Sequence, residues 1–172
     1  QKDIEQCSNL IQKTIQYLNK DSKEFTGVLY GGFFKCKDGI KFIEFNARFG
    51  DPEAMNVINS FETPFAEVAT DIFHGNLSKE KCKFNGKNSF LVYVVSKEYA
   101  VKSKVPPVEF TLNKESIEKK GVKLYFANAK KIEENRYTSV SNSRLFAIEK
   151  TGDDFEEIKK QVYQVVKEEV DE

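Results

Sequence analysis

Apolar residues recur at steps of three and four at the start of the chain, the spacing of one face of an amphipathic helix. The residues of this face are Ile4, Cys7, Ile11, Ile15 and Leu18. The pattern predicts a helix over residues 3–19.

Two apolar runs follow, over residues 26–34 and 40–45, and Lys37-Asp38-Gly39 separates them. Aspartate and glycine tolerate positive φ, so Asp-Gly between β-rich runs is a strong indication of a tight hairpin turn. The sequence therefore predicts a β-hairpin with Asp38 and Gly39 as its two-residue turn.

Two helix starts of the same design come next, at Asp51-Pro52 and at Thr63-Pro64. In each pair we expect the polar residue to be the N-cap and proline to be the first helical residue, where it loses no hydrogen bond. Gly75 is expected to end the second of these helices.

The second half of the chain is rich in apolar runs of strand length. We expect strands over residues 90–95, 122–127, 137–140 and 144–149, with a break at Pro106-Pro107.

A closing helix is predicted from about Asp153, where Glu156 completes a capping box. Strands segregated from helices in this way indicate an α+β architecture rather than a doubly wound sheet. The stretch over residues 75–87 is polar and rich in lysine, which suggests a boundary. We therefore expect a first domain over residues 1–80 and a β-rich domain with a closing helix over residues 81–172.

Composition excludes several classes of protein. Leucine, isoleucine, valine and phenylalanine make up 49 of the 172 residues, which is enough for a core and argues against global disorder. Basic and acidic residues both number 27, so the chain is no polycation for nucleic acid. There is neither an apolar run of about 18 residues nor a signal peptide, so we expect no membrane association. Because the chain starts with Gln1 in a helical pattern, we expect it to be a piece of a longer protein.

The cysteines and the histidine offer little chemistry. Cys7, Cys36 and Cys82 lie far apart without a CxxC pair, which predicts reduced thiols in a cytoplasmic protein rather than disulfides or a zinc site. His74 lies at the predicted end of a helix, where a cation is stabilising. With His74 in that role, no histidine remains for a serine or cysteine nucleophile.

Charge is uneven along the chain. Residues 79–131 contain 13 lysines and 5 glutamates, whereas residues 150–172 contain 4 lysines and 8 acidic residues. The positive stretch is either a solvated surface or a field that steers a phosphate-bearing substrate. The aromatic residues of the strands alternate like core residues, so they do not suggest a stacking platform for nucleic acid.

A row of polar residues in the second hairpin strand is the main candidate for chemistry. Side chains alternate between faces along a strand, so Glu44, Asn46 and Arg48 share one face, and Ile43, Phe45 and Ala47 share a face suited to a core. The oxygens of Glu44 and Asn46 suit a hard cation such as Mg²⁺. The planar guanidinium of Arg48 can donate two parallel hydrogen bonds to a phosphate or a carboxylate.

The alternative is that this row lies on a solvated sheet face. Two neighbours favour a site. A turn at residues 38–39 would set Gly31 opposite Asn46 and Phe33 opposite Glu44, and glycine leaves room for a ligand near the backbone. The helix start at Asp51-Pro52 offers free N–H groups to anions. If Asp51 is the N-cap, its own carboxylate accepts hydrogen bonds from some of these N–H groups.

The segment Glu44-Phe45-Asn46-Ala47-Arg48-Phe49-Gly50-Asp51-Pro52-Glu53 resembles the C-terminal signature of the glycinamide ribonucleotide synthetases, which belong to the ATP-grasp superfamily. Further segments follow in the order and spacing of that family, so the resemblance covers most of the chain from Thr26 onwards. These segments are Thr26–Gly32, Gly121–Ala127, Arg136–Thr138 and Ser143–Leu145. The resemblance implies the C-terminal half of an ATP-grasp domain, with an antiparallel sheet and helices, followed by a small strand-rich domain.

The resemblance also implies a reaction. These enzymes use ATP to activate glycine as an acyl phosphate, and the amine of 5-phosphoribosylamine attacks it to give glycinamide ribonucleotide, ADP and phosphate. By position, Glu44 and Asn46 match the ligands of Mg²⁺ (or Mn²⁺), and Arg48 matches a residue that contacts ATP and the transferred phosphoryl group. Gly50 and Asp51 match the substrate end of the site.

The chain departs from the family pattern at two places, where it has Glu98-Tyr99-Ala100 and Ser141-Asn142-Ser143. The glycine-rich lid of the family is absent, and the family's chains are more than twice as long. We therefore expect the missing N-terminal part of the same enzyme as a partner and no activity of this fragment alone. The alternatives are another ATP-grasp carboxylate–amine ligase, or a non-catalytic domain of the same fold that binds a nucleotide or a partner.

Overall fold

The computed structural model describes residues 2–21, 24–99 and 106–171. It divides into two compact units, of which the first comprises residues 1–54 and 61–84 and the second comprises residues 55–60 and 85–172. Within the described ranges, no helix combines the length and the apolar character that a membrane crossing requires. The domain boundary that the sequence suggests between residues 80 and 81 stays a prediction.

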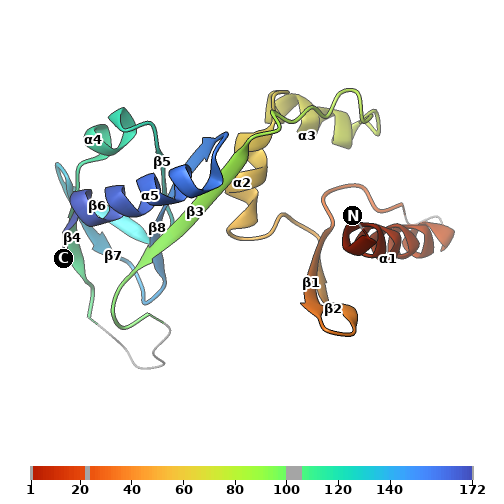
Figure 1. Ribbon diagram of the computed structural model, residues 1–172, viewed down its shortest axis with the longest axis horizontal. Coiled ribbons are helices and arrows are strands. Elements are labelled where there is room, and N and C mark those ends of the chain that lie inside the picture. The colour runs from red at the N-terminus through yellow and green to blue at the C-terminus, as the bar shows by residue number, and fades with distance from the viewer. Residues whose placement is uncertain (1, 22–23, 100–105, 172) are drawn as a thin grey trace. The chain divides into compact units, whose positions relative to one another are not determined.

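The first unit begins with a helix and a hairpin, as the sequence predicts (Figure 1). Its elements are α1 (Lys2–Leu18), the short 3₁₀ helix η1 (Asn19–Asp21), β1 (Tyr30–Cys36), β2 (Gly39–Asn46) and α3 (Phe65–Phe73). Helix α1 contacts both strands, and Asp3 pairs with Lys35 of β1 at 2.5 Å. None of the residues of α1 is fully buried, so its apolar face stays partly open.

The register of the hairpin differs from the predicted one. Cys36 pairs with Gly39, so residues 37–38 form the loop, and the expected turn at residues 38–39 is wrong by one residue. A bulge between Gly32 and Phe33 then shifts the ladder, with Ile43 as the extra residue. Gly39 has a φ of +118°, which explains why glycine is needed directly after the loop rather than inside it.

The two proline pairs do not start helices in the expected way. Asp51 and Pro52 lie in a turn and are joined by a cis peptide bond, and α2 (Glu53–Ser60) begins after them. In α3 the N-cap is Pro64, without a side-chain cap. The hydroxyl of Thr63 instead donates to the carbonyl of Lys81 at 2.7 Å, so this threonine fastens the loop after α3.

The end of α3 agrees with the prediction. His74 is the C-cap, and Gly75 follows with a φ of +68°. Aromatic rings hold the start of α3: Phe65 contacts Phe49 with ring centroids 5.6 Å apart, and Phe61 stacks on Phe84 at 4.5 Å.

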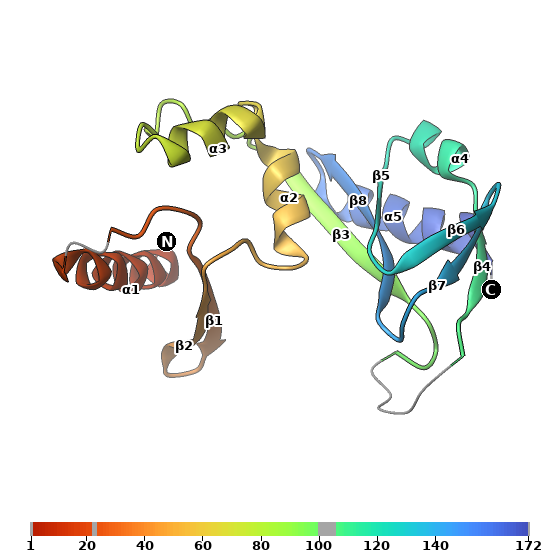
Figure 2. The ribbon, with the colours of Figure 1, turned by 180° about the vertical axis from the view of Figure 1, so that it is seen from behind.

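The second unit contains two antiparallel sheets (Figures 1 and 2). One has the strand order β3-β8-β5, and the other has the order β6-β7-β4-β9. The strands are β3 (Asn88–Val95), β4 (Glu109–Leu112), β5 (Lys123–Phe126), β6 (Ala129–Glu133), β7 (Arg136–Ser139), β8 (Arg144–Gly152) and β9 (Val170–Asp171). The fold is therefore α+β with antiparallel sheets, as expected.

The helices α4 (Lys114–Lys119) and α5 (Phe155–Glu169) also belong to this unit, together with residues 55–60 of α2. Helix α5 contacts β3 and β8 and buries Ile158, Val162 and Val165 on the sheet. Its N-cap is Asp154, whose carboxylate accepts from the N–H of Glu157 at 2.9 Å, one residue later than the capping box predicted from Asp153.

The core lies between the sheets and α5. Its buried members are Phe110, Leu112, Ile117, Val122, Tyr137, Leu145, Phe146, Ile148, Val162 and Val165. Strand β8 contributes five consecutive buried residues, 145–149, to the interior of this unit. The apolar runs that predicted strands β3, β5, β7 and β8 thus supply the inner layer.

An ion-pair cluster ties α4 to α5. Lys120, the C-cap of α4, contacts Glu168 at 2.8 Å and Glu169 at 2.5 Å. These hydrogen bonds from Lys120 lower the pKa of both carboxyls below the usual 4.5 and raise the pKa of Lys120 above 10.5.

The cluster predicts a specific pH dependence of stability. Its contribution is fully present above pH 4.5 and is lost as the pH falls through the lowered carboxyl pKa values. It is lost again as the pH rises above 10.5 and through the raised pKa of Lys120. Lys120→Met should therefore flatten the acid side of a plot of urea midpoint against pH. Lys119→Met, which removes an exposed neighbour that forms no ion pair with any described residue, should keep the wild-type slope.

Candidate functional site

Strand β2 brings two of the predicted site residues together. The amide Nδ2 of Asn46 donates to Oε1 of Glu44 at 2.9 Å, so both side chains lie on the same side of the strand. Opposite them on β1, Gly32 pairs with Glu44 and Tyr30 pairs with Asn46. The predicted partners Phe33 and Gly31 are therefore wrong, but a glycine still stands opposite the carboxylate.

The donor set fits a hard cation. Carboxylate and amide oxygens are ligands that Mg²⁺ accepts, and the hydrogen bond between Asn46 and Glu44 shows that the two side chains are close enough to share one ion. An amide presents oxygen in place of nitrogen by turning over. In the described part of the chain, no group of three or more His, Cys, Asp or Glu residues forms a metal cage. Such a pair of ligands suits an ion whose remaining positions are filled by water and phosphate.

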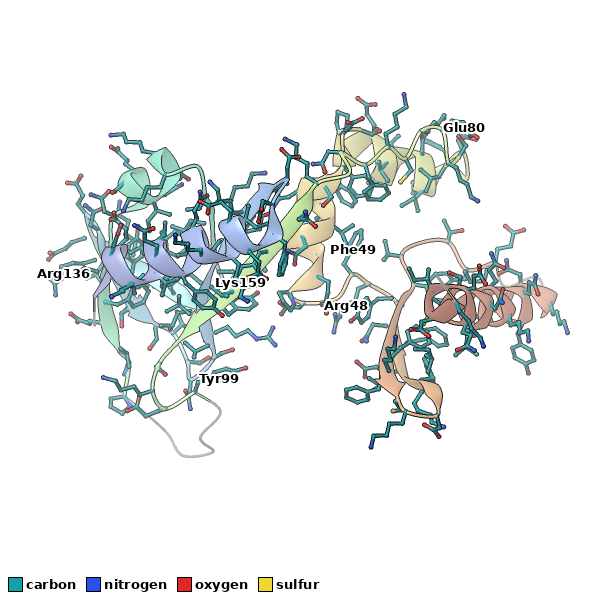
Figure 3. All side chains as sticks on the ribbon, viewed as in Figure 1. Arg48, Phe49, Glu80, Tyr99, Arg136 and Lys159 are labelled. Atoms are coloured by element: carbon teal, nitrogen blue, oxygen red, sulfur yellow. The ribbon has the colours of Figure 1, made fainter. Side chains whose placement is uncertain are left out.

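Arg48 lies beyond the strand, because β2 ends at Asn46 and residues 47–48 form a bend. Its guanidinium donates to the carbonyl of Phe49 at 2.8 Å and makes no ion pair with an acid of the described ranges. Figure 3 shows Arg48 and Phe49 on the segment that links β2 to α2. The expected alternation thus covers Glu44 and Asn46 but does not reach Arg48.

The opposite face of β2 does not form the expected core. Ile43 is 49% exposed and Ala47 is exposed, whereas Phe45 is half-buried and its ring contacts Phe42 at 4.5 Å. The bulge at Ile43 interrupts the alternation, and the contacts of α1 with the hairpin leave Ile43 exposed.

Gly50 and Asp51 follow in the turn before α2. Gly50 is buried and has no room for a side chain, because a Cβ there would collide with Oε2 of Glu53 and lie 2.9 Å from the ring of Tyr30. Asp51 is exposed. The glycine therefore allows a close approach of three parts of the site.

Tyr30 and Glu53 form a contact that the sequence does not predict. The Tyr30 hydroxyl donates to Oε1 of Glu53 at 3.0 Å. This hydrogen bond, with burial and the charges of Glu53 and Glu44, raises the pKa of the Tyr30 phenol above 10.0. Glu53 is the last residue of the signature segment. The hairpin register predicted from the turn does not place Tyr30 beside Glu44 and Asn46, so the sequence does not predict this contact.

Known proteins with similar sequences identify the relatives of this chain. Residues 1–54 match the family model described as phosphoribosylglycinamide synthetase, ATP-grasp (A) domain. The phosphoribosylamine–glycine ligase of Methanobrevibacter smithii is 37% identical over 160 residues, which are 93% of this chain and 36% of that protein. The ligase of Methanothermobacter thermautotrophicus is 36% identical over 154 residues, which are 90% of this chain and 34% of that protein.

The chain is homologous to part of the phosphoribosylamine–glycine ligases. It spans about a third of the length of the relatives that it matches.

Solved structures show the same fold. The phosphoribosylamine–glycine ligase of Thermotoga maritima superposes with a TM-score of 0.77 at 20% identity, over 98% of this chain and 40% of that one. The N5-carboxyaminoimidazole ribonucleotide synthetase of the same organism superposes with a TM-score of 0.58 at 14% identity, over 93% of this chain and 41% of that one. The α+β architecture therefore matches part of a phosphoribosylamine–glycine ligase structure.

The two segments that we expect to depart from the family pattern contact each other in the second unit. The amide of Asn142 donates to the carbonyl of Glu98 at 2.7 Å, and the amide of Asn128 donates to the carbonyl of Ser141 at 3.2 Å. Nearby in the sequence, the guanidinium of Arg144 lies over the ring of Tyr93 at 4.9 Å. Ala100, the last residue of the first departure, lies outside the described residues.

Gly50→Ala tests the packing at the start of the turn. The added methyl group should push the Glu53 carboxylate away and break its hydrogen bond with Tyr30. We expect the pKa of Tyr30 to fall towards its usual value, measured as the tyrosinate absorbance of the variant during an alkaline titration. Tyr30→Phe assigns the absorbance change, and Gly32→Ala, where a Cβ meets only ordinary van der Waals contacts from 3.7 Å, is the control for a glycine substitution. An unchanged titration in Gly50→Ala would show that the contact survives.

Proposed function

We propose that this chain is the C-terminal part of an ATP-dependent ligase that joins glycine to 5-phosphoribosylamine. The products are glycinamide ribonucleotide, ADP and phosphate, a step of de novo purine biosynthesis. The pairing of Glu44 with Asn46 inside the signature segment is the observation that carries the proposal. The homology to phosphoribosylamine–glycine ligases over more than nine tenths of the chain supports it.

The reaction consists of two transfers. First, a carboxylate oxygen of glycine bonds to the γ-phosphorus of ATP while the bond from that phosphorus to ADP breaks, which gives glycyl phosphate. The amine nitrogen of 5-phosphoribosylamine then bonds to the carbonyl carbon, phosphate leaves with the bridging oxygen, and the nitrogen loses a proton. Both transfers move negative charge, so cationic groups are the main requirement of the site.

In this proposal Glu44 and Asn46 hold Mg²⁺, or Mn²⁺ in its place, together with the phosphates of ATP. When bound, the ion supplies charge neutralisation at the phosphates. The guanidinium of Arg48, which has no acidic partner in the described ranges, binds the phosphoryl group and stabilises its charge. Gly50 and Asp51 shape the substrate end, where the close packing of Gly50 against Tyr30 and Glu53 fixes the turn.

The missing N-terminal part of the same enzyme is the proposed partner. Large apolar side chains of α1 and the hairpin are exposed, among them Ile4 at 71% and Phe34 at 65%. A surface of this kind is suited to contact with another part of a folded protein. The glycine-rich lid over the phosphates would come from that part, so the fragment alone should not turn over ATP.

A second candidate is another ATP-grasp carboxylate–amine ligase with a different acceptor. The contact between Asn142 and Glu98 favours this candidate. It brings together the two segments that depart from the family pattern, so both departures change the same part of the second unit. The proposed metal ligands Glu44 and Asn46 would have the same role in either ligase.

The test is ADP release by the complete protein that carries this chain, with glycine and phosphoribosylamine omitted in turn. Release that requires both substrates supports the glycine ligase. Release that requires a different amine or acid supports the second candidate and rejects the purine step. A folded protein without turnover under any of these conditions would leave a non-catalytic domain that binds a nucleotide or a partner.

A further inference from the structure

The second unit contains a cavity of about 320 Å³ that the proposed reaction does not use. Three lysines from different elements line it: Lys87 before β3, Lys123 at the start of β5, and Lys150 in β8. The carboxylate of Glu149, the hydroxyl of Thr151 and the amide of Asn59 lie among them. The volume is that of a small-molecule site.

A buried carboxylate forms part of the wall. Glu149 is only 1% exposed, and its oxygens accept hydrogen bonds from Ser89 at 2.6 Å, Thr151 at 2.6 Å and Asn59 at 2.9 Å. Neutral side chains therefore satisfy the acid, and among the residues that the structure describes no lysine forms an ion pair with it. The network is a rigid polar wall, since each of its members is held by another side chain.

The same network positions the lysines. The ammonium of Lys123 donates to Oδ1 of Asn59 at 2.6 Å, and this amide also contacts the Tyr125 hydroxyl. The ammonium of Lys150 donates to the carbonyls of Gly121 at 2.9 Å and Lys120 at 3.2 Å, at the end of α4. Two of the three charges are thus held by hydrogen bonds that do not neutralise them, which lowers the entropic cost of binding an anion.

Lys87 differs from the other two because its ammonium has no hydrogen-bond or ion-pair partner among the described residues. Its backbone is fixed, since its N–H donates to Oδ1 of Asn85 at 2.9 Å, and the amide of Asn85 donates to the carbonyl of Asn59 at 3.3 Å. The third charge is therefore available to a ligand.

We propose that this cavity binds the phosphate group of a small molecule. Three ammonium groups and one carboxylate leave a balance of +2, which matches the charge of a phosphate dianion. The lysines supply charged donors to phosphate oxygens, and the Thr151 hydroxyl and the amides supply neutral ones.

The cavity lies at the opposite end of the sheet from Arg144. Lys123 pairs with Glu149 at one end of the β5–β8 ladder, whereas Phe126 pairs with Phe146 near the end that carries Arg144. Gly121 and Lys123 belong to a segment that resembles the ligase family, but none of the residues of the proposed metal and phosphoryl site lines this cavity. The inference therefore does not rest on the proposed function.

Lysine acylation followed by mass spectrometry tests the site in the intact protein that carries this chain. Ribose 5-phosphate and inorganic phosphate are titrated separately, against ribose and against sodium chloride of matched ionic strength. We expect acylation of Lys87 and Lys123 to slow by about fivefold when the phosphate compound reaches about four times its Kd. Lys131, an exposed lysine of β6, is the internal control and should react at an unchanged rate.

Lys123→Gln is the decisive variant, because it removes one charge and keeps a polar hydrogen-bond donor at the end of the side chain. It should abolish the protection of Lys87, whereas Lys131→Gln should leave that protection intact. Stronger protection by ribose 5-phosphate would identify a phosphate ester as the ligand, and equal protection by both compounds would identify free phosphate. Equal protection by sodium chloride, or full protection in Lys123→Gln, would overturn the proposal.

Discussion

Replacing Glu44 by glutamine in the complete protein that carries this chain is expected to reduce the proposed Mg²⁺-dependent turnover by about a thousandfold or more. Glutamine keeps the size of the side chain and an oxygen acceptor for Asn46, but it removes the negative charge that a divalent cation requires. The side chain is exposed, and its hydrogen bond to Asn46 lies at the surface. Stability should therefore stay close to that of the wild type while turnover is lost. Steady-state ADP formation over a range of Mg²⁺ concentrations, with thermal unfolding in parallel, measures both quantities.

Asp38→Asn is the matched control for this experiment. Asp38 lies in the loop of the same hairpin, is exposed, and pairs with Lys41 at 2.7 Å, so its substitution also removes one surface carboxylate. It should retain wild-type turnover with the same dependence on Mg²⁺. If Glu44→Gln keeps the wild-type rate, the metal assignment is wrong. If both variants lose turnover equally, the loss reflects the charge of the hairpin rather than a ligand.

The position of Glu44 beside Asn46 could be predicted from the sequence because it depends on strand alternation alone, a local property of the backbone. The residues opposite them could not, since register depends on the loop and on bulges. Gly39 belongs to β2 rather than to the turn, and Ile43 is an extra residue in the ladder. Period-two patterning contains no information about such an insertion. Tyr30 was missed for this reason.

Burial was harder to predict than secondary structure. An apolar face indicates that a strand or helix covers something, but it does not indicate what covers it. Ile43 and much of α1 are apolar and exposed in the first unit. Conversely, Glu149 is acidic and buried, because partners up to 90 residues away in the sequence supply its hydrogen bonds. A local sequence pattern cannot predict a contact between residues that are so far apart in the sequence.

The shorter elements of the second unit were also missed, and each lacks a local pattern. Strand β6 has two consecutive lysines and a single large apolar residue, Ile132, whereas β9 is only two residues long and exists by pairing with β4. Helix α4 has six residues, with Ile117 as its buried anchor. Longer apolar runs such as β3 and β8 were predicted, because their own composition determines their burial.

Phe146→Ala is expected to have the largest effect on stability in the second unit, about 3–5 kcal/mol. The side chain is completely buried in the central strand of the β3-β8-β5 sheet, and its ring stacks on Phe110 at 5.4 Å. Its neighbours belong to β4, β5 and β8 and cannot all close the resulting cavity, because each is held by its own sheet ladder. Hydrogen exchange of the β8 amides in the intact protein measures the loss within this unit alone, independently of the first unit.

Val140→Ala is the control for Phe146→Ala, because Val140 is 65% exposed in the same unit and its truncation leaves no cavity. In this variant the free energy of opening, measured by hydrogen exchange of the β8 amides, should stay within about 0.5 kcal/mol of the wild-type value. An equally small change in Phe146→Ala would mean that the sheets and α5 repack around a missing ring, so that the core is less tightly fixed than the contacts of Phe146 imply. A large change confined to Phe146→Ala would establish that the unit unfolds around this residue. The phosphate site would then be expected to lose its ligand in the same variant, since Glu149 and Lys150 lie on the strand that Phe146 anchors.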